Sequence, residues 1–229
     1  MSARRISLSD RLVTAAVAQT RPCRAALRRG LLALSVILVA FAVAAWYGRA
    51  LLLRSAADFW IESDPIGPAD AVAVFGGGLG DRPFAAANYY RQGLVKRIVI
   101  SNVHESPAEG LGVLLPDTAA NRAVLLKSGV PEGDIETFGA DLSSTREEAL
   151  ALRDWAARER VHSIIVPTEI FAARRLRWML HRVFGNDLVI RVPALDPPEY
   201  RDDDWWRHER GIIGFQNELI KYVYYRLKY

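Results

Sequence analysis

The stretch DAVAVFGGGLGDR, from Asp70 to Arg82, constrains the fold of this chain most strongly. Residues 71–75 are continuously apolar, a pattern typical of a strand that is buried on both faces. Three glycines follow, and a helical pattern begins at Arg82. Backbone N–H groups at such a turn, together with the N-terminus of a helix, favour negative charge. The stretch therefore predicts a strand, a glycine turn and a helix start that together form an anion site.

This stretch does not match the two common phosphate-binding patterns. Asp81 stands where a third glycine would complete the dinucleotide fingerprint, and no Gly-Lys-Ser/Thr follows as in a P-loop. A second interpretation therefore stays open, in which the glycines only allow a tight turn from strand to helix.

The rest of the chain alternates short β-branched runs with helical patterns. Alternation of this kind predicts βαβ units, a parallel sheet and right-handed crossovers. Residues 102–116 show no clear period and are expected to form a mobile loop over the site, and residues 193–204 are expected to form a second long loop. Strands are expected at 71–75, 97–101, about 135–138, 163–167 and 188–192, and helices at about 82–92, 117–128, 144–160, 169–184 and 204–226.

An uncharged apolar run covers residues 30–47 and extends to Leu53 if Arg49 is tolerated. At about 1.5 Å per residue, such a helix just crosses the hydrocarbon core of a bilayer. Trp46 and Tyr47 stand where an aromatic belt would lie. Seven arginines precede the run, so the positive-inside rule puts the N-terminus in the cytoplasm. We expect a single-pass protein of the plasma (inner) membrane with its domain in the periplasm or outside the cell.

The expected organisation is a basic cytoplasmic tail at 1–29, a transmembrane helix at 30–53, a linker at 54–68 and an α/β domain at 69–229. Three alternatives to a retained anchor stay open. They are a signal peptide cleaved near 42–44, a twin-arginine export signal at 28–29, and a buried core helix.

The distribution of charge excludes some partners. The formal net charge is +4, but residues 1–54 carry nine arginines and one acid, and the remainder is mildly acidic. Nucleic-acid binding by the main domain is therefore not expected. Cys23 is the single cysteine, so no intramolecular disulfide can form, and no histidine has partners at metal-ligand spacing. We predict no metal and no cofactor.

Polar residues follow each of the first four expected strands. Ligands of open parallel sheets bind beyond the carboxyl ends of the strands, so these residues are expected to share one edge. Simpler roles are also open: Ser143 or Ser144 with Glu147 or Glu148 forms a helix capping box, and Thr168 with Glu169 also matches a cap. The converging residues are Gly76, Gly77, Gly78, Ser101, Asn102, His104, Glu105, Asp141, Ser143, Ser144, Thr145, Thr168 and Glu169.

Two amphipathic helical patterns complete the chain. One carries Arg174, Arg175 and Arg177, of which only one is expected to point inward. The C-terminal pattern is expected to close the flank of the sheet, with a membrane-facing surface rich in Trp and Tyr as the alternative. Its apolar residues at helical spacing are Ile212, Phe215, Leu219, Ile220, Val223 and Leu227.

The order and spacing of several motifs resemble the YdcF-like family, a group of bacterial proteins that includes SanA and ElyC. The resemblance covers about residues 68–226. It implies a Rossmann-like three-layer αβα sandwich with a mainly parallel sheet, often preceded by one N-terminal membrane helix. It also implies a link to envelope integrity, peptidoglycan or lipid-carrier metabolism. The motifs are Gly76 to Arg82, Tyr90 with Gly93, Ser101, Gly129-Val130-Pro131, Ser143-Ser144-Thr145 and Thr168 to Arg175.

The chain departs from the family pattern after the fourth strand. The usual Thr-Ser-x-x-His-x-x-Arg has Glu169 in place of the serine and Ala172 in place of the histidine. The acid common before the family's third helix corresponds to Asp117, and Ser144 replaces a common asparagine. If the family histidine is an acid or base, Glu169 takes that role here, or the protein binds without turnover.

We expect a membrane-anchored extracytoplasmic protein that binds or processes a phosphate-bearing, possibly lipid-linked, envelope intermediate. Glu169 or Asp81 is the expected acid or base. The alternatives are a protein that binds S-adenosylmethionine or a nucleotide, and a non-catalytic scaffold of cell-wall assembly. The predicted ligand-binding residues are Gly76, Gly77, Gly78, Arg82, Ser101, Asn102, Ser143, Thr145, Thr168, Arg174 and Arg175.

Overall fold

The computed structural model describes residues 8–229, with side chains from residue 28 onward. The chain divides after Leu52 into an N-terminal helical unit and a compact α/β unit that begins at Leu53. Residues 1–7 of the predicted tail at 1–29, and the side chain of Cys23, lie outside the described part, and residues 8–29 of that tail are helical. Helix α1 (Leu8–Trp60) contains one segment, Arg28–Trp60, that is long and apolar enough to cross a membrane. Its most apolar window is fully exposed, so α1 is not a buried core helix.

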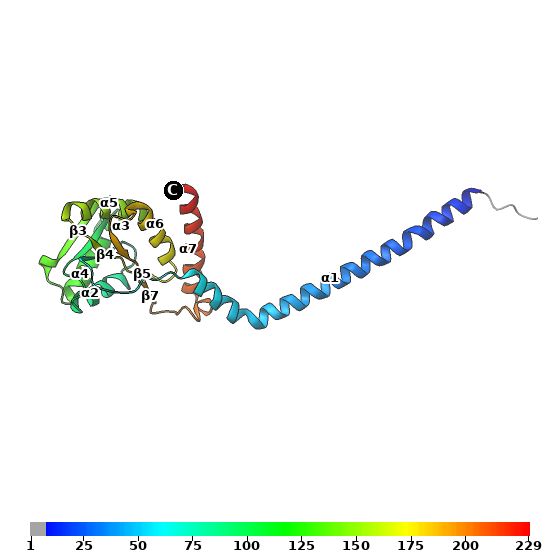
Figure 1. The fold of residues 1–229 in the computed structure, drawn as a ribbon, viewed down its shortest axis with the longest axis horizontal. Helices are drawn as coiled ribbons and strands as arrows, with labels where there is room; N and C mark the ends of the chain where they lie inside the picture. The colour runs from blue at the N-terminus through cyan, green and yellow to red at the C-terminus, as the bar shows by residue number, and fades with distance from the viewer. Residues whose placement is uncertain (1–7) are drawn as a thin grey trace, which may run out of the picture. The chain divides into compact units, whose positions relative to one another are not determined.

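The α/β unit contains a five-stranded sheet in the order β3-β2-β1-β4-β6, and every neighbouring pair is parallel (Figure 1). All five predicted strands are present, and the register pairs Val72 of β1 with Ile98 of β2. The prediction of an α/β fold with a mainly parallel sheet is thus confirmed. The strands are β1 (Ala71–Val74), β2 (Ile98–Val103), β3 (Ile135–Leu142), β4 (Ser163–Ile165) and β6 (Val189–Arg191).

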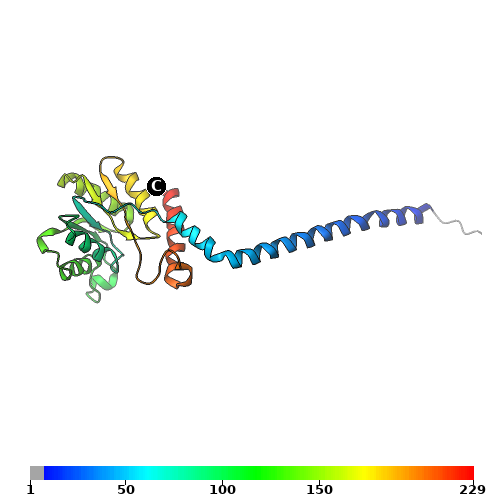
Figure 2. The same cartoon turned by 60° about the horizontal axis from the view of Figure 1, so that its bottom comes forward.

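Helices cover both faces of the sheet, because the buried strands direct alternate side chains to opposite sides (Figure 2). Ala73 and Phe75 face one core with residues of α5 (Thr145–Glu159) and α6 (Ala173–Phe184). Val72 and Val74 face the other core with residues of α2 (Arg82–Arg91) and α4 (Asp117–Lys127). This arrangement gives the three layers of the expected sandwich.

A third cluster, mostly aromatic, joins the end of α1 to α7 (Glu209–Lys228). Trp60 Nε1 donates to Phe171 O at 2.9 Å, and Trp205 Nε1 donates to Leu53 O at 3.2 Å. Residues 53–60 are therefore helical and belong to the α/β unit, where the sequence predicted a linker. Burial of large aromatic side chains stabilises this extra helical segment.

Other boundaries also differ from the predictions. The helix expected from residue 169 begins at Ala173, because Thr168–Glu169 forms strand β5, which pairs with β7 (Ala194–Leu195) inside the second expected loop. The expected loop at 102–116 includes the end of β2 and the short helix α3 (Pro107–Gly110). Two 3₁₀ turns, η1 (Glu132–Asp134) and η2 (Trp205–Arg207), precede β3 and α7.

Candidate functional site

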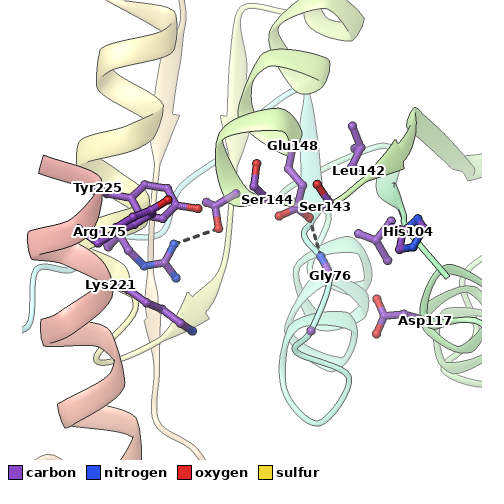
Figure 3. Close-up of a pocket in the computed structure, with 14 residues that line it drawn as sticks. Gly76, His104, Asp117, Leu142, Ser143, Ser144, Glu148, Arg175, Lys221 and Tyr225 are labelled. Carbon is purple, nitrogen blue, oxygen red and sulfur yellow. Dashed lines mark hydrogen bonds between the residues drawn. The ribbon is translucent and has the colours of Figure 1, made fainter. Parts of the chain in front are cut away.

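A cleft of about 620 Å³ opens at the carboxyl ends of β1, β2 and β3 (Figure 3). The glycine turn after β1, the start of α4, the first turn of α5 and one side of α7 form its walls. A smaller hollow of about 230 Å³ shares Gly76, Glu148 and Arg175 with the cleft and reaches Thr168 and Glu169. The sequence-predicted edge of the sheet is therefore the place where polar side chains gather.

Glu148 is the polar group most deeply placed in this cleft. It lies in the first turn of α5 and is 7% exposed, and Gly76 N donates to its Oε1 at 2.8 Å (Figure 3). Burial raises the pKa of the Glu148 carboxyl, and the nearby Asp117 carboxylate raises this pKa further. The Gly76 N–H and Arg82 act in the opposite direction. Glu148 is therefore a carboxyl group that holds its proton to a higher pH than an exposed glutamate.

Glu147, and not Glu148, caps the start of α5, which leaves Glu148 to accept the hydrogen bond from Gly76 N. Ser144 Oγ accepts from Glu147 N, and Glu147 Oε2 accepts from both the N–H and the hydroxyl of Ser143. Glu147 thus satisfies the start of α5, as the sequence predicted for one of the two glutamates. Ser143 still lines the cleft, but its hydroxyl is held by Glu147.

Asp117 faces the glycine turn from the start of α4. Asn121 Nδ2 donates to Asp117 Oδ2 at 3.0 Å, and Glu109 Oε1 accepts from the Asp117 N–H at 2.9 Å. Burial raises the pKa of Asp117, while the Gly77 N–H and Arg82 lower it by smaller amounts. Asp117 and Glu148 therefore form a pair of carboxyl groups on the two sides of the glycine turn.

Ser101 lies beneath the cleft and does not line it. Its side chain is fully buried. In the part of the chain with described side chains, its Oγ is one of three buried polar atoms without a hydrogen-bond partner, with Arg82 Nε and Asn121 Oδ1. The Ser101 hydroxyl nevertheless lies near enough to Glu148 to lower the pKa of that carboxyl. The structure thus places Ser101 beside Glu148 and not among the residues that line the cleft.

Arg82 closes the glycine turn with its guanidinium. Its Nη1 donates to Phe75 O at 3.1 Å and to Gly76 O at 2.6 Å, and its Nη2 donates to Thr168 Oγ1 at 3.2 Å. These bonds use the donors that the sequence assigned to an anion. Arg82 lines the smaller hollow and holds Thr168 against β1, so its role is largely structural.

The three glycines of the turn allow close packing and a left-handed backbone conformation. A Cβ at Gly76 would lie 2.6 Å from Val103 Cγ1, and one at Gly78 would lie 2.4 Å from Arg82 Cδ. Gly77 has φ +78°, a conformation that other residues rarely adopt. The expectation that the Gly76 N–H meets a ligand is wrong in this structure, because Glu148 accepts that hydrogen bond.

Arg175 is the one arginine of α6 that points into the cleft. Its Nε and Nη2 donate to the two carboxylate oxygens of Glu218 at 2.6 and 3.2 Å, and its Nη1 donates to Thr145 Oγ1 at 2.9 Å (Figure 3). Lys221 Nζ donates to Glu218 Oε1 at 3.0 Å. Burial raises the pKa of Glu218, but Arg175 and Lys221 outweigh burial and hold this pKa below its usual range.

Arg174 points away from the cleft, which corrects the prediction for this residue. Its Nε donates to Trp60 O at 2.8 Å, its Nη2 donates to Phe59 O, and its Nη1 pairs with Glu62 at 2.9 Å. The last carbonyls of a helix have no partner inside the helix, and Arg174 supplies one at the end of α1. Asn102 also fails the prediction, because it is exposed on β2 and does not line the cleft.

Glu169 and Asp81, the predicted acid and base, meet at a third hollow of about 210 Å³. Gly77, Gly78 and Tyr200 also line this space. Burial raises the pKa of both carboxyl groups, and each also lies close enough to other acids to raise it further. Burial raises the pKa of Tyr200 well above its usual value, and nearby acids, Glu169 first, raise it further. The pair is therefore brought together, but on the other side of the glycine turn from most of the cleft.

A histidine–aspartate pair stands at the rim of the cleft. His104 Nδ1 lies 2.6 Å from Asp141 Oδ1, and this hydrogen bond raises the pKa of His104 (Figure 3 shows His104). Asp141 has φ +55°, which is uncommon for a residue other than glycine. The sequence placed both residues at the edge of the sheet but assigned no role to either. The described side chains include no cluster of His, Cys, Asp and Glu that is suited to a metal ion.

The sequence missed Glu148, Glu218 and Lys221 as parts of the site. The sequence held a partial indication of Glu148. Both Glu147 and Glu148 follow Ser144, and a capping box uses only one glutamate, so the other was left without a role. Glu218 and Lys221 gave no signal beyond a helical pair, because their contact with Arg175 joins distant parts of the chain. No family model matches this sequence, and no curated protein matches it either.

Proposed function

We propose that this protein is a membrane-anchored protein of the bacterial envelope that binds a phosphate-bearing ligand, such as a lipid-linked intermediate, and acts on it by general acid–base chemistry. The observation that carries the proposal is Glu148: a buried carboxyl with a raised pKa that opens on a polar cleft. A buried carboxyl with a raised pKa can protonate a leaving group, and its carboxylate can then take a proton back.

The charges around the cleft support a ligand that carries an anionic group such as a phosphate. Lys221 has a half-exposed side chain, and the cleft also receives Arg175, the Thr145 hydroxyl and the Tyr224 ring. Carboxyl groups with raised pKa values, Glu148 and Asp117, carry less negative charge than exposed acids would. Arg175 and Lys221 both contact the Glu218 carboxylate, so these three side chains together leave one net positive charge beside the cleft for a phosphate group.

The proposed anchoring is by α1, with the N-terminus in the cytoplasm. It is supported by the apolar segment Arg28–Trp60 and by the arginines that precede it in sequence. A ligand attached to a lipid would be delivered close to a domain tethered in this way. The resemblance of Gly76–Arg82 and Thr168–Arg175 to the YdcF-like family supports the same reading.

Titration calorimetry on the full chain in detergent micelles tests the ligand class. The probes are farnesyl diphosphate, inorganic phosphate, ATP and S-adenosylmethionine, and phosphate release from farnesyl diphosphate is measured alongside binding. We expect farnesyl diphosphate to bind most tightly, and Glu148→Gln to lower phosphate release at least about 100-fold. Asp154→Asn, on the exposed side of the same helix, is the control and leaves both measurements unchanged.

A second candidate is a non-catalytic scaffold. It is favoured by Ala172 at the position of the family histidine and by the internal hydrogen bonds that already occupy Gly76, Arg82 and Arg175. Binding of farnesyl diphosphate without phosphate release, in the wild-type chain and in Glu148→Gln alike, would decide for the scaffold. Preferred binding of ATP or S-adenosylmethionine would overturn both proposals in favour of a nucleotide-type ligand.

A further inference from the structure

Helix α7 is covered on one side only. That side packs on the α/β unit through Gly211, Glu218 and Tyr225, which are buried. The opposite side carries seven large side chains that are between 40% and 84% exposed. A large exposed apolar face usually marks an interaction site, so this face calls for a partner. The exposed residues are Ile212, Ile213, Leu219, Ile220, Val223, Tyr224 and Leu227.

The helical period gathers these seven residues on one continuous face. At about 100° per residue they fall within an arc of about 140°. Exposed cations stand at both margins of this arc: Arg210, Lys221 and Lys228 at one margin, and Arg226 at the other. An apolar face with cations at its edges is the arrangement of helices that lie in the interface of a membrane, where long cationic side chains reach the head groups.

The charge of α7 favours an anionic lipid surface over a second copy of the chain as the partner of its exposed face. Residues 55–229 carry a net negative charge, whereas residues 209–229 carry four cations and two acids. The C-terminal segment that forms α7 thus carries a net positive charge within an otherwise acidic unit. A second copy of the chain would bring the same cations face to face, whereas anionic lipid head groups complement them.

The turn before α7 contacts Leu53, which follows the apolar run at 30–47 closely in the sequence. Trp205, in the turn that precedes α7, donates to the carbonyl of Leu53. Leu53 follows Tyr47, at the end of the apolar run, by about six residues, which span at most about 20 Å even when fully extended. If α1 crosses a membrane, the first turns of α7 therefore cannot be far from its surface.

We propose that the exposed face of α7 lies on the lipid surface of an anionic membrane and serves as a second membrane contact beside α1. This inference rests on the proposed anchoring by α1 but not on the ligand of the cleft. Lys221, Tyr224 and Tyr225 of α7 line the cleft, so this contact sets the mouth of the cleft beside the lipid head groups. A lipid-linked ligand then enters the cleft from the plane of the membrane.

An environment-sensitive dye on α7 of the full chain tests the inference. Cys23→Ser removes the single native thiol, and Ile220→Cys or Ile213→Cys then receives a nitrobenzoxadiazole label. The protein is reconstituted in vesicles of phosphatidylcholine and phosphatidylglycerol. We expect blue-shifted emission at both positions and at least about twofold quenching by doxyl-labelled lipid. Asn88→Cys, on the exposed surface of α2, is the control and stays water-like and unquenched.

Each other result overturns the inference in a distinguishable way. Water-like emission at residues 213 and 220 removes the lipid contact. Blue-shifted emission that doxyl lipid does not quench, and that disappears when the protein is diluted in lipid, assigns the face to a second copy. Loss of the protein from the vesicles on alkaline carbonate extraction removes the anchoring on which the inference rests. The calorimetric binding experiment does not depend on any of these outcomes.

Discussion

Glu148 Oε1 accepts a hydrogen bond from Gly76 N at 2.8 Å, and this contact joins the first turn of α5 to the end of β1. In anion-binding turns before a helix, backbone N–H groups donate hydrogen bonds to the bound anion. In this protein a carboxyl group of the chain takes that position. The cleft is therefore organised around a protonatable group, and its behaviour depends on pH.

The stability of the protein should depend on the ionisation of Glu148. Burial raises the pKa of this carboxyl in the folded state above the ordinary value of 4.5, so the folded state holds the proton more tightly than the unfolded state. The contribution is fully present below about pH 4.5 and is lost as the pH rises through the raised folded pKa. We expect Glu148→Gln to flatten this part of the pH profile of urea unfolding. An unchanged slope would show that Glu148 is ionised in the folded state.

Gly76→Ala should destabilise the α/β unit by about 1–3 kcal/mol, because its Cβ would meet Val103 at 2.6 Å. The matched control is Gly80→Ala, since a Cβ at that position meets no atom within 4 Å. Thermal or urea unfolding of both variants gives the comparison. Equal stability of the two variants would contradict the close approach of β1 and β2 at this point.

Arg175→Met should cost about 3 kcal/mol or more of unfolding free energy, because it leaves the buried Glu218 with Lys221 as its remaining partner. The double variant Arg175→Met/Glu218→Leu should recover most of this loss, since no buried charge is then left unpaired. The control is Arg210→Met, which breaks the exposed pair with Glu199 and should cost less than about 1 kcal/mol. Additive losses in the double variant would argue against coupling between Arg175 and Glu218.

Arg174→Ala should loosen the end of α1 and leave the cleft unchanged. It removes hydrogen bonds to the carbonyls of Phe59 and Trp60, at a cost of about 1–3 kcal/mol. Limited proteolysis should show faster cleavage near residues 53–62, while the affinity for farnesyl diphosphate stays at the wild-type value. A loss of affinity with unchanged proteolysis would return Arg174 to the ligand-binding residues.

The arginines that precede the apolar run predict the orientation of the protein by the positive-inside rule. With an alkaline phosphatase reporter fused after Tyr229, we expect activity, because this enzyme folds only outside the cytoplasm. A fluorescent reporter that works only in the cytoplasm should stay dark in the same position. The opposite pair of results would place the cleft in the cytoplasm and favour a nucleotide or S-adenosylmethionine ligand.

Local pattern in the sequence was enough for the elements and their layers. The strands at 71–75 and 97–101 are apolar without alternation, and such runs separated by helical periods fit few arrangements other than a covered parallel sheet. The edge of the sheet that collects polar residues followed from the same pattern, since parallel strands all end on one side. The uncharged run at 30–47 likewise needed no tertiary information.

Tertiary structure decided which polar residues make the site. Glu147 and Glu148 are neighbours with the same chemistry, and only their 100° separation around α5 turns one to the cap and the other to Gly76. Arg174 and Arg175 part in the same way, one toward the end of α1 and the other toward Glu218. Glu148 and Gly76 are 72 positions apart in the chain, Arg175 and Glu218 are 43 apart, and Arg174 and Trp60 are 114 apart. Sequence periodicity reports the burial of apolar side chains, and it carries no record of which charged neighbour meets which distant partner.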